Sequence, residues 1–251
     1  MLAAENLSVR RGGAVVVEGL SATLTPGAIT AIVGPNGAGK SSLLLALAGL
    51  LEPVAGGALL DGEALAAMHP RARAQALGYL PQTPDVAWDV AVESLVALGR
   101  LPWRDRGTGE VEAAIAALAL EKLRHRPISQ LSGGERARVL LARVLAGTPR
   151  WILADEPLAA LDLAHQLGLI AHLKACAAAG QGVVVVLHDL AIAMNHADRV
   201  LVMKGGHLIA DGAPRDALAP AVIAQGWEIA ARWVGEPGKQ ALVVDGVGTG
   251  R

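Results

Sequence analysis

The stretch Gly34-Pro35-Asn36-Gly37-Ala38-Gly39-Lys40-Ser41 is the most informative part of this 251-residue sequence. It follows the pattern G-x-x-x-x-G-K-[S/T], and it stands between an apolar run, Ala28 to Val33, and a helical segment, Lys40 to Leu51. The glycines let successive backbone N–H groups turn inward, where they and the helix N-terminus bind oxyanions. We therefore expect a phosphate-binding loop, with Lys40 near the β- and γ-phosphates and the Ser41 hydroxyl on Mg²⁺.

Apolar runs alternate with helical segments in the rest of the chain. Trp151 to Ala154 and Val183 to Leu187 are suited to buried strands, and Leu163 to Ala179 between them is helical. This alternation predicts an α/β fold with a mostly parallel sheet flanked by helices. Three helical segments between Val90 and Ala146 stand between two core strands, so we expect a helical lobe over about 85–148 within a single domain spanning 1–251.

The C-terminal part contains a hairpin signal and two tryptophans. A hairpin is expected from Arg199 to Ala210, through Gly205-Gly206. From Pro214 we expect a helical stretch that includes Trp227 and Trp233, with both tryptophans packed on the chain's own core.

The composition excludes several classes of protein. A net charge of -1, from 22 basic and 23 acidic residues, provides no general positive field for nucleic acid, and we expect no nucleic-acid partner. The only cysteine, Cys176, excludes an intramolecular disulfide. Mean hydropathy is high, at +0.42, yet the most apolar run, Ser41 to Leu51, is about half of the ~20 residues that a membrane-spanning helix needs. Glu5 and Asn6 stand where a signal peptide would be apolar, so a cytoplasmic location is expected.

Two carboxylates follow the apolar run that begins at Trp151. Asp155, at the end of a buried strand, is placed to hold Mg²⁺ directly or through water. Glu156 is placed to polarise a water aimed at the γ-phosphate. A solvated acidic turn is the simpler interpretation of such a pair alone, but it does not account for the intact phosphate loop. No guanine-binding motif of the Asn-Lys-x-Asp kind is present, which argues against a GTPase.

A third motif, Leu131-Ser132-Gly133-Gly134-Glu135, precedes a helix. A serine and two glycines at a helix start form a second anion site, although the same residues also suit an ordinary N-cap.

With this motif the sequence resembles the nucleotide-binding subunit of an ABC transporter, along nearly its whole length. Gly34 to Ser41 match the Walker A loop, Ile152 to Asp155 the Walker B strand, and Ser132 to Gly134 belong to the signature motif. The resemblance implies a P-loop NTPase core, an antiparallel β subdomain and a helical lobe that carries the signature. It further assigns four parts of the site: the catalytic glutamate, the Q-loop glutamine near Mg²⁺, the D-loop and the switch histidine, in that order. These are Glu156, Gln82, Ala160-Leu161-Asp162 and His188.

The resemblance also implies a mechanism. Two copies bind Mg-ATP between them, so that the Ser132, Gly133 and Gly134 of one copy close over the nucleotide held by the other copy's loop. This sequence departs from the family at Arg11, where an aromatic residue often stacks on adenine, and at Ser42, where threonine is frequent. The planar Arg11 guanidinium is suited to stack on the base, and simple exposure of Arg11 to solvent is the alternative interpretation. The other six histidines and Cys176 are interpreted as having no functional role.

One further stretch indicates a branch of the family. Ala97 to Trp103 is similar to importer ATPases for iron–siderophore complexes, haem and cobalamin. We therefore expect a separate membrane permease, indirectly a substrate-binding protein, and a peripheral location on the cytoplasmic face of the bacterial inner membrane. Three alternatives stay open: an importer ATPase for a metal ion or another small solute, a soluble ABC ATPase acting in translation or DNA repair, and a P-loop kinase. The cargo never contacts this chain, so its sequence does not identify it.

Overall fold

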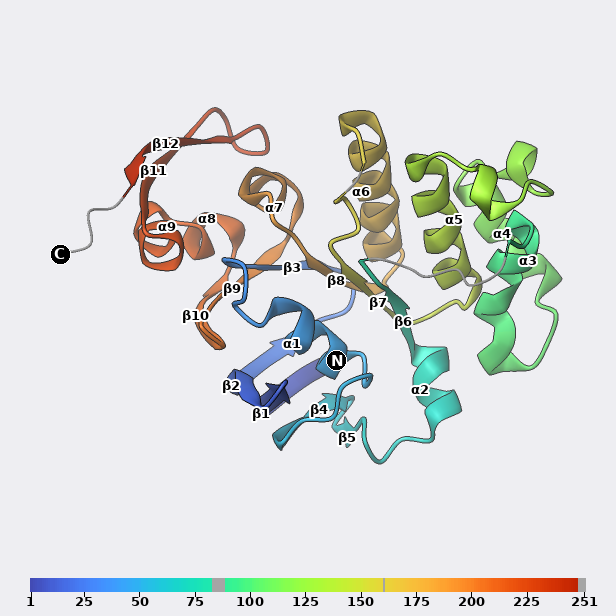
Figure 1. Cartoon of the computed structure of the whole chain (residues 1–251), viewed down its shortest axis with the longest axis horizontal. Helices are drawn as coiled ribbons and strands as arrows, with labels where there is room; N and C mark the ends of the chain where they lie inside the picture. The colour runs from blue at the N-terminus through green and yellow to red at the C-terminus, as the bar shows by residue number, and fades with distance from the viewer. Residues whose placement is uncertain (83–88, 160, 248–251) are drawn as a thin grey trace.

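A computed structural model describes residues 1–82, 89–159 and 161–247 of the chain (Figure 1). The strands in chain order are β1 (Leu2–Arg11), β2 (Ala14–Leu24), β3 (Ile29–Val33), β4 (Ala55–Leu60), β5 (Glu63–Ala64), β6 (Leu77–Leu80), β7 (Trp151–Asp155), β8 (Gly182–Val186), β9 (Arg199–Lys204), β10 (His207–Gly212), β11 (Ile229–Val234) and β12 (Ala241–Val247). The helices are α1 (Lys40–Leu47), α2 (Pro70–Ala76), α3 (Val92–Ala97), α4 (Thr108–Ala117), α5 (Gly133–Ala146), α6 (Leu163–Ala178), α7 (Leu190–His196), α8 (Pro214–Ala217) and α9 (Pro220–Trp227), with the 3-10 helices η1 (Leu98–Trp103), η2 (Glu121–Leu123) and η3 (Ile128–Gln130).

A six-stranded sheet forms the centre of the molecule, in the order β10-β9-β3-β8-β7-β6. Its pairs are parallel except β10 with β9, so the expected mostly parallel sheet is confirmed. Every residue of β3, β7 and β8 is buried, because helices and a second sheet cover both faces. The carboxyl ends of these three parallel strands therefore lie at one edge, where α/β sheets place their ligands.

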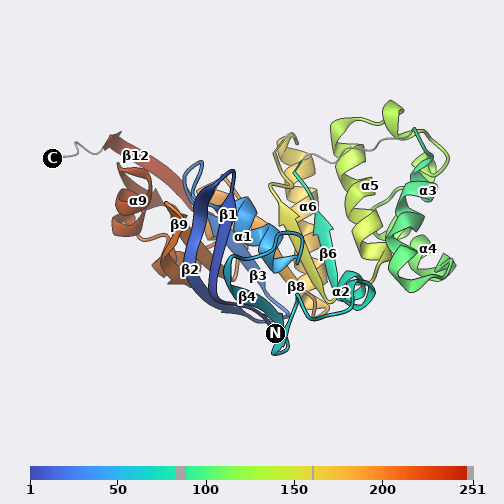
Figure 2. The same cartoon turned by 60° about the horizontal axis from the view of Figure 1, so that its bottom comes forward.

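A four-stranded antiparallel sheet, β2-β1-β4-β5, covers one side of α1 (Figure 2). Its inward residues, among them Leu2, Leu7 and Val17, join Leu43 and Leu44 of α1 in one apolar cluster. This confirms the antiparallel β subdomain, and the packing holds α1 against the central sheet.

Helices α3, α4 and α5 form a helical lobe on the far side of α6 from α1 in both views (Figures 1 and 2). The charged stretch Arg100 to Gly109 within the lobe is partly helical, because η1 extends to Trp103 and α4 begins at Thr108. The lobe boundary proposed at residue 85 lies outside the described residues. None of the helices in the described part of the chain is both long enough and apolar enough to cross a bilayer.

The C-terminal part both confirms and corrects the sequence predictions. The hairpin of β9 and β10 forms as expected. The helical stretch ends at Trp227, however, and Trp233 lies in strand β11, so its assignment to a helix was wrong. Glu228, at the end of α9, has φ 60°, which ends that helix and lets the chain reverse into β11. The Trp233 indole N–H donates to the Leu218 carbonyl at 2.8 Å, so this tryptophan does pack on its own chain.

Candidate nucleotide site

The loop between β3 and α1 is held tightly between neighbouring strands. Gly34 has φ 154°, and a Cβ built on it would lie 2.2 Å from the Met203 carbonyl oxygen of β9. Gly39 has φ 96°, and its Cβ would lie 2.2 Å from the Val16 carbonyl oxygen of β2. Both positions therefore need glycine, because any side chain would collide with backbone. A Cβ on Gly37, with φ 79°, would meet no atom of residues 1–82, 89–159 or 161–247 within 4 Å, so the crest of the loop faces away from this part of the chain.

Lys40 is the first residue of α1 and is 6% exposed. Its Nζ donates to the Gly34 and Pro35 carbonyls, both at 2.9 Å, and so lies folded along the loop. Burial lowers its pKa, while the charges of Glu156 and Asp155 partly offset that effect. Among the described residues, no side chain caps the start of α1. A buried cation and uncapped helix amides together form a site for a polyphosphate.

Ser41 and Asp155 provide oxygen atoms beside the loop. The Ser41 hydroxyl donates to Oδ1 of Asp155 at 3.0 Å. Burial raises the pKa of Asp155, and the neighbouring Glu156 charge adds to the rise. A hydroxyl and a carboxylate fit Mg²⁺, which binds oxygen ligands. Within the described residues, no three His, Cys, Asp or Glu side chains gather as metal ligands, so a cation here would draw further ligands from phosphate and water.

Glu156 connects the loop to two distant segments. It lies directly after β7, and its φ of 47° is uncommon for a residue with a side chain. Its Oε1 lies 2.5 Å from Nε2 of His188, which follows β8. Its Oε2 accepts a hydrogen bond from the side-chain amide of Gln82, which follows β6. The three residues predicted as catalytic are thus in contact, since β6, β7 and β8 are adjacent parallel strands.

A cavity of about 280 Å³ lies over the loop. The walls away from the loop include Val16, Glu156, His188 and Arg11, so Arg11 is placed where a base could stack. On the loop side, the cavity is lined by Asn36, Gly37, Ala38, Gly39, Lys40, Ser41 and Ser42.

The signature residues lie outside the cavity over the loop. Ser132 is the N-cap of α5: its hydroxyl accepts from the Glu135 N–H at 3.3 Å, and the Glu135 carboxylate accepts from the Ser132 N–H at 2.9 Å. The ordinary N-cap is thus present, and it leaves the hydroxyl proton free to donate to an anion. Ser132, Gly133 and Gly134 do not line the cavity over the loop. Helix α6 lies between α1 and α5 (Figures 1 and 2).

Comparison with protein families agrees with this geometry. Residues 17–159, more than half of the chain, match the family model described as ABC transporter. The chain belongs to the ABC transporter family. As a member, it is an ABC-type ATPase and binds ATP.

Curated relatives of this ABC ATPase cover most of its length. A hemin import ATP-binding protein HmuV from Pseudomonas aeruginosa is 46% identical over 230 residues, covering 88% of this chain and 89% of the relative. The protein of the same name from Rhodopseudomonas palustris is 41% identical over 237 residues, covering 91% of this chain and 88% of the relative.

Solved structures share the fold. One is described as an inward-facing conformation of a putative metal-chelate type ABC transporter. It is 25% identical, covers 99% of this chain and 98% of its own, and has a TM-score of 0.82. A second is the dimeric post-hydrolysis state of the ATP-binding cassette MJ0796 bound to ADP and phosphate. It is 25% identical, covers 86% of this chain and 99% of its own, and has a TM-score of 0.75.

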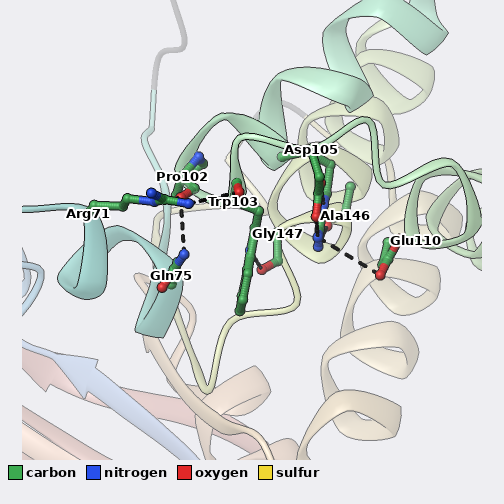
Figure 3. A network of polar contacts seen from close by, with 9 residues as sticks. Arg71, Gln75, Pro102, Trp103, Asp105, Glu110, Ala146 and Gly147 are labelled. Carbon is green, nitrogen blue, oxygen red and sulfur yellow. Dashed lines mark hydrogen bonds and ion pairs between the residues drawn. The ribbon is translucent and has the colours of Figure 1, made fainter.

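In this ABC ATPase, the motif that indicated a branch of the family begins at the last residue of α3, Ala97, and then forms η1, which is fixed to two helices (Figure 3). On one side, Arg71 and Gln75 of α2 donate to the Pro102 carbonyl, and Arg71 also donates to the Trp103 carbonyl at 2.8 Å. These bonds satisfy carbonyls at the open end of the 3-10 helix.

On the other side, η1 is fixed to the C-terminal end of α5. The Trp103 indole donates to the Gly147 carbonyl at 2.9 Å (Figure 3). The buried Arg100 donates to the Ala146 carbonyl at 3.1 Å and forms a two-bond ion pair with Asp105. Helix α5 therefore carries the signature at its first turn and η1 at its last.

The D-loop is described only in part, because Ala160 lies outside the described residues. Its last residue, Asp162, is the N-cap of α6 and accepts from the His165 N–H at 2.9 Å. Sequence reasoning gave His165 no role. His165 and Gln166 follow the Asp162 cap by three and four residues, and no local sequence signal marked them. Gln166 donates to the carbonyls of Leu158, just before the D-loop, and Leu161, within it.

Proposed function

We propose that this chain is the ATP-hydrolysing subunit of a hemin importer and acts as a homodimer with a separate permease. The observation that carries the proposal is the division of the site. Glu156, His188 and Gln82 meet beside the phosphate loop, whereas the signature serine is at the start of α5 and does not line that cavity. A second copy that presents its Ser132 to this loop would complete the site.

In the proposed reaction, the loop amides and Lys40 bind the phosphates, and Ser41 and Asp155 hold Mg²⁺. The bound ion would neutralise charge that develops on the phosphate oxygens. Glu156 accepts a hydrogen bond from the attacking water and orients it, with His188 and Gln82 fixing the carboxylate. Catalysis is then mostly positioning and electrostatics. Arg11 contacts the adenine from the outer wall, and Ser42 adds polar support next to Ser41.

An exposed apolar surface supports the dimer. Leu163 and Leu167, on the first turns of α6 directly after the D-loop, are 71% and 49% exposed. Large apolar side chains at adjacent turns of one helix favour a protein contact. A second copy seated on this surface, with ATP between the subunits, would bury both leucines. The dimeric cassette with ADP and phosphate is a structural precedent.

The η1 surface supports the permease contact. Leu98 and Leu101 are 42% and 68% exposed on its rim. Beside them a groove of about 270 Å³ is lined by Arg143, whose guanidinium has no partner within the described residues. Burial lowers the pKa of Arg143, so a carboxylate would be favourable there. The occupant we infer is a cytoplasmic permease segment that offers an apolar side chain and an acidic one.

The hemin cargo rests on the relatives' names alone. These relatives, at 46% and 41% identity, are both hemin import proteins. A metal-chelate cargo is the second candidate, favoured by the structural neighbour of that description. For either cargo, we place the chain on the cytoplasmic face of the bacterial inner membrane, with a substrate-binding protein acting indirectly.

The deciding experiment has two parts. Glu156→Gln protein in Mg-ATP should form a dimer by light scattering, and Lys40→Ala should not; a monomer under saturating ATP contradicts the proposal. In the second part, the chain is reconstituted with the co-purified permease in lipid vesicles. Addition of hemin and its binding protein should then raise the ATPase activity of the chain. Stimulation by ribosomes or DNA would favour the soluble ABC ATPase instead, and phosphate transfer to an added metabolite would favour a kinase.

A further inference from the structure

His165 connects the D-loop to the signature helix within one chain. Its ring lies against Gly134, the second residue of α5. A Cβ built on Gly134 would come 2.4 Å from Cδ2, 2.6 Å from Cγ and 2.7 Å from Nε2 of the His165 ring. Three ring atoms at nearly equal distance mean that the imidazole covers the space where a side chain at position 134 would begin.

The other edge of the imidazole is fixed by the D-loop residue Asp162. Its Oδ1 lies 2.7 Å from Nδ1 of His165 and also accepts the His165 backbone N–H. Those two hydrogen bonds hold the pKa of Asp162 below its usual range, so this side chain is an ionised acceptor near neutral pH. Nδ1 therefore carries a proton, and the ring orientation is set.

The first turn of α6 thus contacts two motifs. Gln166 binds carbonyls of the D-loop segment, while His165 binds the last D-loop residue and packs on the first turn of the signature helix. A shift of either motif in the chain would have to displace this ring.

We propose that His165 is a positioning residue, which sets the spacing between the D-loop and the signature so that both meet the partner copy's ATP together. This inference rests on the proposed composite site. It also gives Gly134 a role in its own chain: a side chain there would push the ring, and with it Asp162, out of place.

The test uses the full-length chain with Glu156→Gln, and the readouts are dimer affinity in Mg-ATP, ATP affinity of the monomer, and the melting temperature. His165→Ala should weaken the dimer about tenfold, a coupling usual for residues in contact, while ATP affinity of the monomer stays constant. His165→Asn keeps a donor for Asp162 but lacks the ring, and His165→Phe keeps a ring without the donor. Each of these two variants should weaken the dimer, but by less than His165→Ala does. His172→Ala, two turns along the same helix, is the matched control.

A double-mutant cycle separates packing from nucleotide contact. Gly134→Ala should abolish the dimer when His165 is present, and adding His165→Ala should restore part of it because space for the methyl group opens. If His165→Ala leaves dimer affinity unchanged, or Gly134→Ala is equally damaging with and without His165, the inference is overturned. If the Glu156→Gln chain itself never dimerises, the composite site fails instead.

Discussion

Nε2 of His188 lies 2.5 Å from Oε1 of Glu156, across the ends of two adjacent parallel strands. The Gln82 amide donates to the other carboxylate oxygen. Both oxygens of the predicted base thus contact residues that follow β6 and β8, and each oxygen has a second lone pair that can accept a hydrogen bond from water. Glu156 is therefore positioned by tertiary contacts with two segments that are distant in the sequence.

Glu156→Gln should lower ATP hydrolysis by about a hundredfold or more, because an amide does not accept a proton from the water. The amide retains the size of the side chain, so affinity for ATP should stay within about twofold, well under the tenfold that corresponds to 1.4 kcal/mol. Phosphate release and equilibrium binding of a fluorescent ATP analogue measure the two quantities. Normal turnover would remove Glu156 from the reaction.

Lys40→Ala should weaken ATP binding at least about tenfold, since a hydrogen bond to a charged group contributes about 1.5–3 kcal/mol. The nucleotide-free protein should stay folded, because burial already disfavours the charged Lys40 and lowers its pKa. Titration calorimetry and a thermal melt check both statements. Lys174→Ala, an exposed lysine of α6, is the control and should bind ATP normally. Unchanged affinity in Lys40→Ala would contradict the assignment of the loop.

Gly99→Ala should destabilise the lobe by about 1–3 kcal/mol, the usual cost of forcing atoms into a packed site. A Cβ on Gly99 would lie 2.0 Å from the Arg143 carbonyl oxygen, so η1 would have to move away from α5. Urea unfolding measures the change. Gly109→Ala is a matched control, because a Cβ there would meet nothing within 4 Å. Equal stability of the two variants would show that η1 is not held against α5.

Asp105→Asn should lower the melting temperature at neutral pH, because the buried Arg100 guanidinium loses the nearer of its two carboxylate partners, and Glu110 lies farther away, at 3.9 Å. Hydrogen bonds from Arg100 hold the pKa of Asp105 below its ordinary value of 3.8. The unfolded chain therefore binds more protons than the folded one between the lowered pKa and 3.8, so this stabilisation is complete above 3.8 and is lost as pH falls through that window.

The difference in melting temperature between the natural chain and Asp105→Asn should accordingly close in acid. Scanning calorimetry from pH 7 downward measures it, and Asp216→Asn serves as the control. A difference in melting temperature that does not change with pH would mean that protonation of Asp105 is not coupled to the stability of the folded chain.

The sequence by itself determined the fold class, the phosphate loop and the hairpin at Arg199 to Ala210. It also showed that a carboxylate, Glu156, follows directly after a buried strand. These features follow from consecutive residues: glycines with a required backbone geometry, apolar runs with a strand period, and a carboxylate directly after a buried strand. A short stretch carries its own local preference, so its structure can be predicted without knowing what it packs against.

The tertiary structure alone decided which distant residues meet. Gln82 and Glu156 are 74 positions apart and touch because β6 pairs with β7. His165, one of seven histidines in the sequence, gains a role only from packing on Gly134. Trp233 lies in a strand rather than a helix because it pairs with β12, and no local preference specifies that pairing. Such contacts depend on strand register and helix packing, which the whole chain fixes together.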